Sequence, residues 1–260
     1  MTQVTRLWPL LTATHRYDKS ISTWQRGHGV RIEAPILAYL IETRQGRILY
    51  DVGCDYSKLH DPARRARWYD PQAFPMGAPE MTEEQRLPAH FARLGLSPAD
   101  IDLVFLGHLH FDHAGGLCEV CGAEVHVHAD ELAAARAQAD EAYFADDFAG
   151  DYRWKVQRGE YELLPGVRAI ETPGHTAGHM SLLIELPKGK PVILAGDAAD
   201  LQENLDQEIA PGSLWQARED LAIASIRKLK ALAGETGGEL WPNHDMAFYQ
   251  GLKRFPEYHS

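Results

Sequence analysis

The sequence has few cysteines, few basic side chains for its acidic content and no long hydrophobic run. Its three cysteines, Cys54, Cys118 and Cys121, are an odd and sparse set, unlike the dense, even frameworks of secreted disulfide-rich domains. The 26 lysines and arginines face 37 aspartates and glutamates, which gives a formal charge of -11. Because such a field repels phosphate backbones and anionic lipid surfaces, we expect neither a nucleic-acid partner nor a membrane partner.

Membrane and export signals are also missing from the pattern. No apolar run reaches the roughly 18 residues that a membrane helix needs. Residues 1–15 lack the basic start, long apolar stretch and small-residue cleavage site of a secretory signal. The sequence therefore predicts a cytoplasmic protein. Its 260 residues contain no repeat or linker that marks a boundary, so we predict a single domain over residues 1–260.

Strand and helix patterns alternate along the chain. Short β-rich apolar runs predict strands at residues 36–42, 48–51, 101–106, 124–128, 167–171, 181–185 and 191–195. Helical spacing predicts helices at residues 83–94, 129–139 and 222–233, the last of them ending at Gly234. Many charges and four prolines predict an irregular insertion at about 55–82. The alternation indicates sheet layers covered by helices.

The segment 107–116 (GHLHFDHAGG) carries the densest chemistry. It begins where the predicted strand 101–106 ends. Residues two apart in extended backbone point to one side, so His108 and His110 can converge on one ion. Asp112 and His113 follow where the chain turns and can reach a second ion nearby. A solvated polar loop is the alternative, but four ligand-type side chains in six residues repel one another if protonated and waste hydrogen bonds if buried without a partner.

Three further ligand-type residues follow downstream, each just past a predicted strand or turn. His175 lies in the stretch Thr-Pro-Gly-His, whose Pro and Gly fit the centre of a type II turn. Asp197 follows the strand at 191–195, and His244 lies in the stretch Trp-Pro-Asn-His-Asp. Each alone is a weak signal, since a lone His or a strand-end Asp is more often structural. Their combination with the 107–116 segment is strong.

Together these residues resemble the signature of the metallo-β-lactamase superfamily, which is His-x-His-x-Asp-His followed by a distal His, a distal Asp and a last His. The resemblance spans about residues 36–245. It implies an α/β fold of the αββα sandwich type, in which two mixed β-sheets pack face to face and helices cover the outer faces.

The resemblance also implies two divalent metal ions at the sheet edges. By family analogy each ion takes three side chains: one takes His108, His110 and His175, the other Asp112, His113 and His244. Asp197 would bridge the two ions. Imidazoles and carboxylates without a thiolate suit zinc, which we take as the default, and also iron, manganese or cobalt.

Within the superfamily, the sequence motifs of this chain are most similar to those of the quorum-quenching N-acyl homoserine lactonases and the related 4-pyridoxolactonases. The stretches that carry this likeness are HLHFDHAGG, TPGHTAGHMSLL, Gly-Asp-Ala-Ala at 196–199 and His-Asp at 244–245. One position departs from the pattern. Those lactonases usually carry a Tyr three residues after the bridging Asp, whereas this chain has Asp200.

The resemblance implies a hydrolase that opens a lactone ring by attack of a metal-bridging hydroxide. Asp112 and Asp200 are the candidate catalytic carboxylates, Asp112 also as a ligand and Asp200 as a proton donor or merely as a loop cap. Because Asp200 replaces the Tyr, a dinuclear hydrolase of another ester, a thioester or a phosphotriester is the alternative. An oxygen-using iron enzyme of the same fold and a catalytically dead sensor stay open as further alternatives. A homodimer is what the lactonase likeness suggests.

Several residues keep two interpretations. Asp51 resembles a family aspartate that orients a ligand imidazole, or it is a turn residue. His179 supports the site or belongs to the core. Cys118-x-x-Cys121 has no second cysteine pair to complete a zinc ribbon, so loop cysteines without a chemical role are expected. Two aromatic-rich stretches, at 68–74 and 143–154, wall a substrate pocket or pack the domain.

Overall fold

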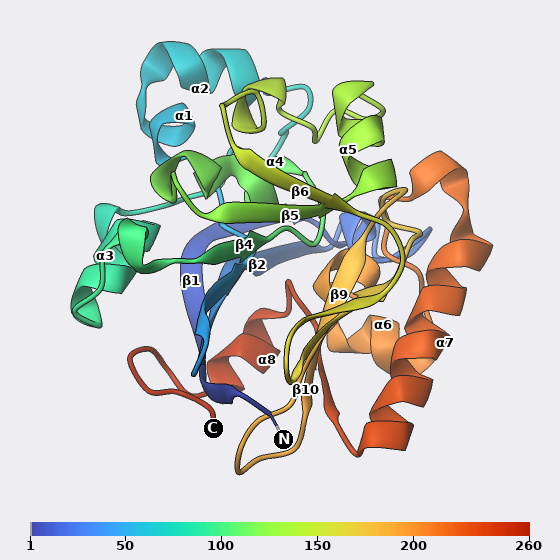
Figure 1. Ribbon diagram of the computed structural model, residues 1–260. Coiled ribbons are helices and arrows are strands. Elements are labelled where there is room, and N and C mark those ends of the chain that lie inside the picture. The colour runs from blue at the N-terminus through green and yellow to red at the C-terminus, as the bar shows by residue number, and fades with distance from the viewer. Residues whose placement is uncertain (1) are drawn as a thin grey trace.

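The computed structural model describes residues 2–260, so Met1 of the expected domain lies outside it. Two mixed β-sheets form its centre (Figure 1). The first sheet has the order β1 (Val4–Asp18), β2 (Arg31–Thr43), β3 (Gly46–Tyr50), β4 (Leu103–Phe105), β5 (Glu124–His128), β6 (Arg153–Gln157). The second has the order β11 (Glu239–Trp241), β10 (Val192–Leu194), β9 (Met180–Ile184), β8 (Val167–Glu171), β7 (Tyr161–Leu164).

The two sheets pack face to face through alternating side chains. On β2, Tyr39 and Ile41 enter the cluster between the sheets, while Leu40 faces the other way. On β9, Leu182 faces the first sheet and Leu183 faces outward. In central strands such as β2 and β9, this two-residue period places one apolar face in the central core and the other under a helix. These central strands are therefore buried on both sides and have nearly continuous apolar sequences.

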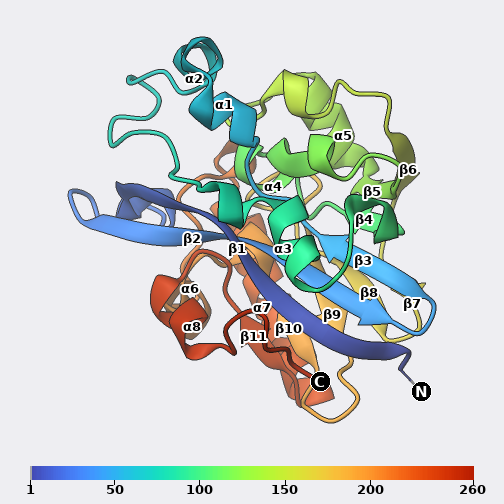
Figure 2. The same cartoon turned by 90° about the vertical axis from the view of Figure 1, so that its left-hand side faces the viewer.

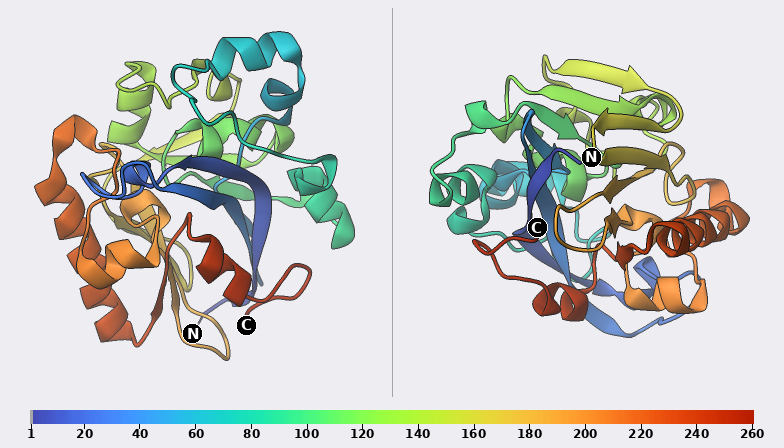
Figure 3. Two further views of the ribbon diagram at one scale, coloured as in Figure 1. Left: turned by 180° about the vertical axis from the view of Figure 1, so that it is seen from behind. Right: turned by 60° about the horizontal axis from the view of Figure 1, so that its bottom comes forward.

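Helices cover both outer faces (Figures 1 and 3). On the first sheet, α3 (Leu87–Arg93) and α5 (Ala129–Arg136) bury Phe91 and Leu132 in one cluster with β4 and β5. On the second sheet, α6 (Gln202–Gln207) and α7 (Glu219–Thr236) bury Leu205 and Ile226 against β8 to β10. The expected αββα sandwich is thus confirmed.

The long first strand was not predicted. β1 pairs with β2 along most of its length, from Val4 opposite Thr43 to Asp18 opposite Arg31, and Figure 2 shows both strands crossing the molecule. Register shifts interrupt the pairing, one of them between Leu11 and Ala13. A shift of this kind breaks the two-residue alternation, which is why the pattern did not identify the strand. The strands β6 and β7 and the helices α6 and α8 (Met246–Gly251) were also missed.

The predicted insertion at 55–82 is only partly irregular, so that expectation was wrong for its first half. Helices α1 (Tyr56–His60) and α2 (Pro62–Trp68) occupy it, and the side chains of Asp55 and Asp61 accept backbone N–H bonds at their starts. Asp is a strong helix N-cap, a signal that the count of charges and prolines hid. Residues 69–82 carry turns and one isolated bridge, between Glu80 and Thr14.

The ends of other helices also differ from the ends predicted from the sequence. The helix expected at 83–94 divides into a 3-10 turn at Glu83–Gln85 and α3, with Pro88 in the first turn of α3. The last long helix continues past Gly234 to Thr236, and Gly237 ends it with a left-handed φ of 66°. Among residues 2–260, no helix combines the length and apolar character needed to cross a membrane.

Candidate metal centre

The seven predicted ligand residues all follow strands at one edge of the sandwich. His108 and His110 follow β4, and Asp112 and His113 lie in the short helix α4 (Phe111–Ala114). The other three follow β8, β10 and β11, and these are His175, Asp197 and His244. β10 runs parallel to β11, and both β8 and β10 run antiparallel to β9. The carboxyl ends of β8, β10 and β11 therefore meet at one edge, where their loops face the β4 loop.

The structure brings these side chains together in the groupings that the family analogy implied. The ligand atoms of His108, His110 and His175 lie within 4.8 Å of one another. Those of Asp112, His113 and His244 form a second such group. Within the first group, His175 Nε2 lies 3.0 Å from His110 Nδ1. Two nitrogens on one tetrahedral zinc ion, each at about 2.0 to 2.1 Å, lie about 3.3 Å apart, so this spacing suits a shared ion.

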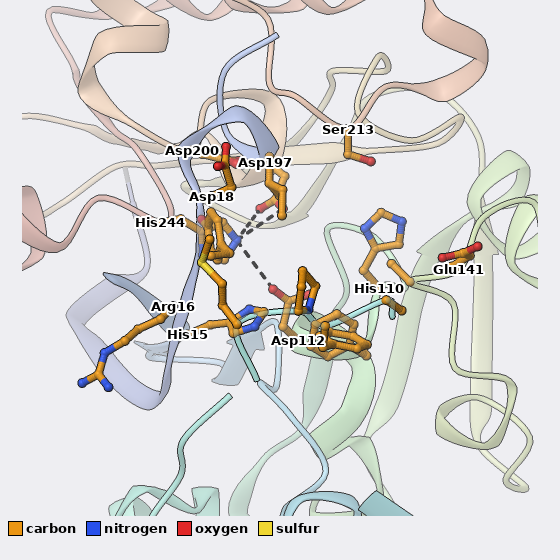
Figure 4. Close-up of a pocket in the computed structure, with 18 of the residues that line it drawn as sticks. His15, Arg16, Asp18, His110, Asp112, Glu141, Asp197, Asp200, Ser213 and His244 are labelled. Atoms are coloured by element: carbon orange, nitrogen blue, oxygen red, sulfur yellow. Dashed lines mark hydrogen bonds and ion pairs between the residues drawn. The ribbon is translucent and has the colours of Figure 1, made fainter. Parts of the chain in front are cut away.

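The Asp197 carboxylate lies between the two groups. Its Oδ2 is 3.7 Å from His108 Nε2 and 3.4 Å from His175 Nε2. Its Oδ1 is 3.3 Å from the Nε2 atoms of both His113 and His244. Figure 4 shows His244 pointing at Asp197 and Asp112. Asp197 Oδ2 also lies 3.3 Å from His244 Nε2, so the carboxylate lies between the two groups, where a bridging carboxylate would be needed.

The outer nitrogens of four imidazoles are fixed by hydrogen bonds. His113 Nδ1 bonds to Asp51 Oδ2 at 2.8 Å, which makes Asp51 an orienting residue. His110 Nε2 lies 3.1 Å from Asp140 Oδ2. Two more rings donate from Nδ1 to backbone carbonyls, His175 to Ser213 and His244 to Pro35. Because Nδ1 carries the proton in these two rings, Nε2 is left as the electron-pair donor that faces the centre.

Two further residues orient Asp197: Asn243, which was not predicted from the sequence, and His179, whose role the sequence left open. Asn243 Nδ2 donates to Asp197 Oδ1 at 2.8 Å. His179 Nε2 accepts the backbone N–H of Asp197 at 2.9 Å, and its Nδ1 bonds to Thr172 Oγ1 at 2.8 Å. His179 therefore supports the site. The only sequence signal for Asn243 is its position beside His244, and none exists for Asp140.

The electrostatics of the cluster favour a cation. Burial alone would raise the pKa of Asp197, but the neighbouring imidazoles, His113 first, hold it well below its ordinary value. Burial opposes the charged form of His244, yet the Asp197 charge raises its pKa to about 10. Burial lowers the pKa of His175 to about 4 and that of His108 well below its ordinary value. An ionised carboxylate thus lies among imidazoles of which two, His108 and His175, are kept neutral by burial, and neutral imidazoles beside a carboxylate are a metal-ligand environment.

Ring nitrogens of His108 and His113 that lack a hydrogen-bond partner indicate whether the cluster fits a metal ion. Both ring nitrogens of His108 and Nε2 of His113 are buried without a hydrogen-bond partner. Buried polar atoms without a partner cost roughly 1 to 3 kcal/mol each, so a native site with several of them calls for a ligand that they bind. Imidazole and carboxylate donors match divalent zinc, iron, manganese or cobalt. The residues present therefore fit divalent metal ions.

Beside the cluster lies a pocket of about 240 Å³. Asp200 lines it, and Asp200 Oδ1 is buried without a hydrogen-bond partner. Burial first, and then the Asp197 charge, raise the pKa of Asp200 to about 8. Tyr17, from the unpredicted strand β1, lines the same pocket and bonds through its hydroxyl to Ser22 Oγ at 2.9 Å. A carboxyl and a phenol from distant segments thus share this wall.

Other residues that line the pocket are apolar. They are Phe74, Pro75 and Met76 of the 69–82 segment, together with Phe111 and Ile21. Of the two aromatic-rich stretches, Phe74 lines the pocket and also packs against a hydrophobic cluster. The other aromatic residues of these stretches do not line the pocket and lie in or against hydrophobic clusters; they are Trp68, Tyr69, Tyr143, Phe144, Phe148, Tyr152 and Trp154.

Fold and site together define a dinuclear metal-dependent α/β sandwich protein, and comparison with known proteins identifies its family. The metallo-beta-lactamase superfamily profile matches residues 31–240. An N-acyl homoserine lactonase from Bacillus sp is 36% identical over 231 residues, which are 88% of this chain and 89% of the relative. The chain therefore belongs to the metallo-beta-lactamase superfamily, as the resemblance implied.

Two solved structures of N-acyl homoserine lactone hydrolases have the same fold as this chain. An N-acyl homoserine lactone hydrolase with the product N-hexanoyl-L-homoserine at its catalytic metal centre superposes with a TM-score of 0.89 at 30% identity, over all of both chains. A variant of AiiA from B. thuringiensis with N-decanoyl-L-homoserine bound at its active site matches equally well, with a TM-score of 0.89, 30% identity and full coverage of both chains.

Proposed function

We propose that this protein is a metal-dependent lactonase that opens the ring of N-acyl homoserine lactones and so acts in quorum quenching. The observation that carries the proposal is the seven-residue cluster around Asp197, which opens into a pocket with one apolar wall. Support comes from the relatives and solved structures above, whose names describe lactone hydrolysis and bound acyl-homoserine products.

The metal ligands are assigned within this proposal as the family analogy gives them. His108, His110 and His175 would hold one ion, and Asp112, His113 and His244 would hold the other. The Asp197 carboxylate, which lies between the two groups, would bind both ions. When bound, such a pair of ions supplies an activated water and electrophilic stabilisation of a carbonyl oxygen.

Residues of the chain hold the ligand residues in place and supply a proton. Asp51, His179 and Asn243 hold the ligand side chains in place through hydrogen bonds of 2.8 to 2.9 Å. Fixed hydrogen-bond partners of this kind reduce the reorganisation that the transition state requires. Asp200 lines the pocket next to Asp197 and His244. We assign to Asp200 Oδ1 the proton that the ring oxygen takes up as the carbon–oxygen bond breaks.

The apolar wall binds the acyl chain. Phe74, Met76 and Ile21 present carbon surface next to the cluster, and burial of an alkyl chain on such a surface contributes about 0.8 kcal/mol per methylene. The polar homoserine part then lies at the cluster, and the tail lies between the 69–82 segment and the end of β1.

Three finer points belong to the same proposal. Zinc is the proposed metal, because imidazole and carboxylate ligands with nitrogen in the majority are typical of it. The protein acts in the cytoplasm and forms a homodimer. Metal analysis of the purified protein, fractionation of the producing cells and light scattering of the metal-loaded protein test these three points in turn.

A pH-stat screen tests the activity, because ring opening of a lactone releases acid. Zinc-loaded protein is offered N-hexanoyl and N-decanoyl homoserine lactones, a thioester, an aryl ester and a phosphotriester at matched concentrations. The expected result is the highest kcat/KM on the lactones, with the activity lost after chelation and restored by zinc. Preference for the thioester or phosphotriester would contradict the proposal and favour the alternative hydrolase that the Tyr-to-Asp departure raised.

A further inference from the structure

Glu131 is a buried carboxylate that lies outside the ligand cluster. It occupies the first turn of α5 and has 0% exposure. No Lys or Arg forms an ion pair with it among residues 2–260. A buried charge needs other stabilisation, and here four donors supply it together with the start of the helix, where the backbone dipole favours negative charge.

Three of the four donors come from the loops that carry the ligands of the first group. Glu131 Oε1 accepts the backbone N–H of Leu109 at 2.9 Å, and Leu109 is the residue between His108 and His110. Glu131 Oε2 accepts from Thr176 Oγ1 at 2.6 Å and from the backbone N–H of Gly178 at 3.2 Å. Thr176 follows His175 directly. One carboxylate thus connects the β4 loop to the β8–β9 loop.

The fourth donor reaches a ligand ring. Tyr143 Oη donates to Glu131 Oε1 at 3.0 Å. The Tyr143 ring packs edge to face against His110, with 4.8 Å between centroids. Tyr143 therefore restricts the rotation of the His110 ring on one side, while Asp140 holds its Nε2 on the other.

Close packing makes this arrangement specific. A Cβ added to Gly178 would lie 2.3 Å from the backbone nitrogen of Glu131 and 2.8 Å from its Cβ. The β8–β9 loop therefore rests directly on the start of α5. A side chain at position 178 would push the loop away and break the bond to Glu131.

From these contacts we propose that Glu131 is a positioning residue, which fixes the two loops so that His108, His110 and His175 converge on one ion. The second group, with Asp112, His113 and His244, receives no bond from Glu131 and depends on it less. This inference rests on the metal centre of the proposed function but not on the identity of the substrate. It is tested by metal binding, so a wrong substrate assignment leaves it intact.

The test is Glu131→Gln, whose amide nitrogen cannot accept the bonds that one carboxylate oxygen accepts. Stepwise zinc binding is measured by competition with a chromophoric chelator, and anomalous scattering from crystals at limiting zinc locates the retained ion. Loss of orienting partners typically lowers metal affinity 10- to 100-fold. We expect a fall in this range at the His108, His110 and His175 position, with the other position within about threefold of the wild type.

A matched control is Glu119→Gln. Glu119 is a nearly buried carboxylate that accepts bonds from Arg86 Nε and the backbone N–H of Leu87, and neither residue carries a ligand. It should lower the stability of the metal-free protein without changing either zinc affinity. If Glu131→Gln lowered stability in the same way and left both affinities unchanged, Glu131 would be structural only and the proposal would be overturned.

Equal loss at both positions would overturn it as well. Should Glu131→Gln fail to fold, Thr176→Val and Tyr143→Phe remove one donor each and keep the carboxylate. Both are expected to weaken zinc selectively at the same position by a smaller factor. Wild-type affinity at that position in both variants would contradict the proposal.

Discussion

Asp51 Oδ2 accepts a hydrogen bond from His113 Nδ1 at 2.8 Å, and both side chains are 1% exposed. The other oxygen, Oδ1, accepts the backbone N–H of Gly107 at 2.8 Å. Asp51 therefore joins the end of β3 to the start of the ligand loop and leaves His113 Nε2 facing Asp197. A single carboxylate fixes both the loop and the ring.

Replacement of Asp51 by Asn should lower metal affinity about 10- to 100-fold, because the amide holds the His113 tautomer less firmly. Chelator competition measures the change. Asp100→Asn is the control, since among residues 2–260 Asp100 accepts side-chain hydrogen bonds from Ser97 alone, in an exposed turn. Equal zinc affinities in Asp51→Asn and the wild type would contradict an orienting role.

Removal of a central ligand should lower the metal content and abolish hydrolysis. In His108→Ala the first group loses a member, and in Asp197→Ala both groups lose the shared carboxylate. Elemental analysis of the purified variants should show fewer than two ions per chain. His126→Ala is the control, because His126 bonds to Glu124 and Tyr161 outside the centre. Full activity in a metal-free sample would refute the scheme.

Asp200→Asn should lower kcat about 100-fold or more if Asp200 is the proton donor. The groups whose charges act on Asp200 are Asp197, His244 and Asp112, and Ser22 bonds to its side chain. An acid is active while protonated, so wild-type kcat should decline as the pH rises through the Asp200 pKa of about 8. The Asn variant should lack this decline. Unchanged kcat at every pH would eliminate the role.

Phe74→Ala should shift the chain-length preference. Loss of this ring from the apolar wall should raise KM for N-decanoyl homoserine lactone several-fold more than for a short-chain lactone, while kcat on the short-chain lactone stays near wild type. Trp154→Ala is the matched aromatic control, since Trp154 packs against the core and does not line the pocket. Equal effects on all chain lengths would place the acyl chain elsewhere.

A buried ion pair should determine the stability of the insertion. Lys58 Nζ lies 2.5 Å from Asp147 Oδ1, with both side chains at most 2% exposed, and also lies over the Trp68 ring. Asp147→Ala leaves the ammonium unpaired in the core, so the free energy of unfolding should fall by about 3 to 5 kcal/mol. Denaturant unfolding of the metal-free protein measures it. The double variant Lys58→Met with Asp147→Leu should recover most of the loss, and no recovery would contradict this explanation.

Much of the site could be predicted because its residues follow strands. His108, His110, Asp112 and His113 form a dense local pattern, and the downstream His175, Asp197 and His244 match a family signature in order. The central strands were also predictable, since strands buried on both faces leave continuous apolar runs. β1 could not be found, because its register shifts remove the alternation, and with β1 the pocket residue Tyr17 was missed.

Ligand type and strand pattern are local properties, so the order of residues was enough to predict which side chains can bind metal and which strands carry them. The bonds that hold those side chains in place could be seen only in the folded chain. Glu131 joins loops 22 and 45 residues away, and Asn243 bonds to a residue 46 positions earlier. Such bonds depend on where folding places distant backbone segments, and no local pattern encodes that placement.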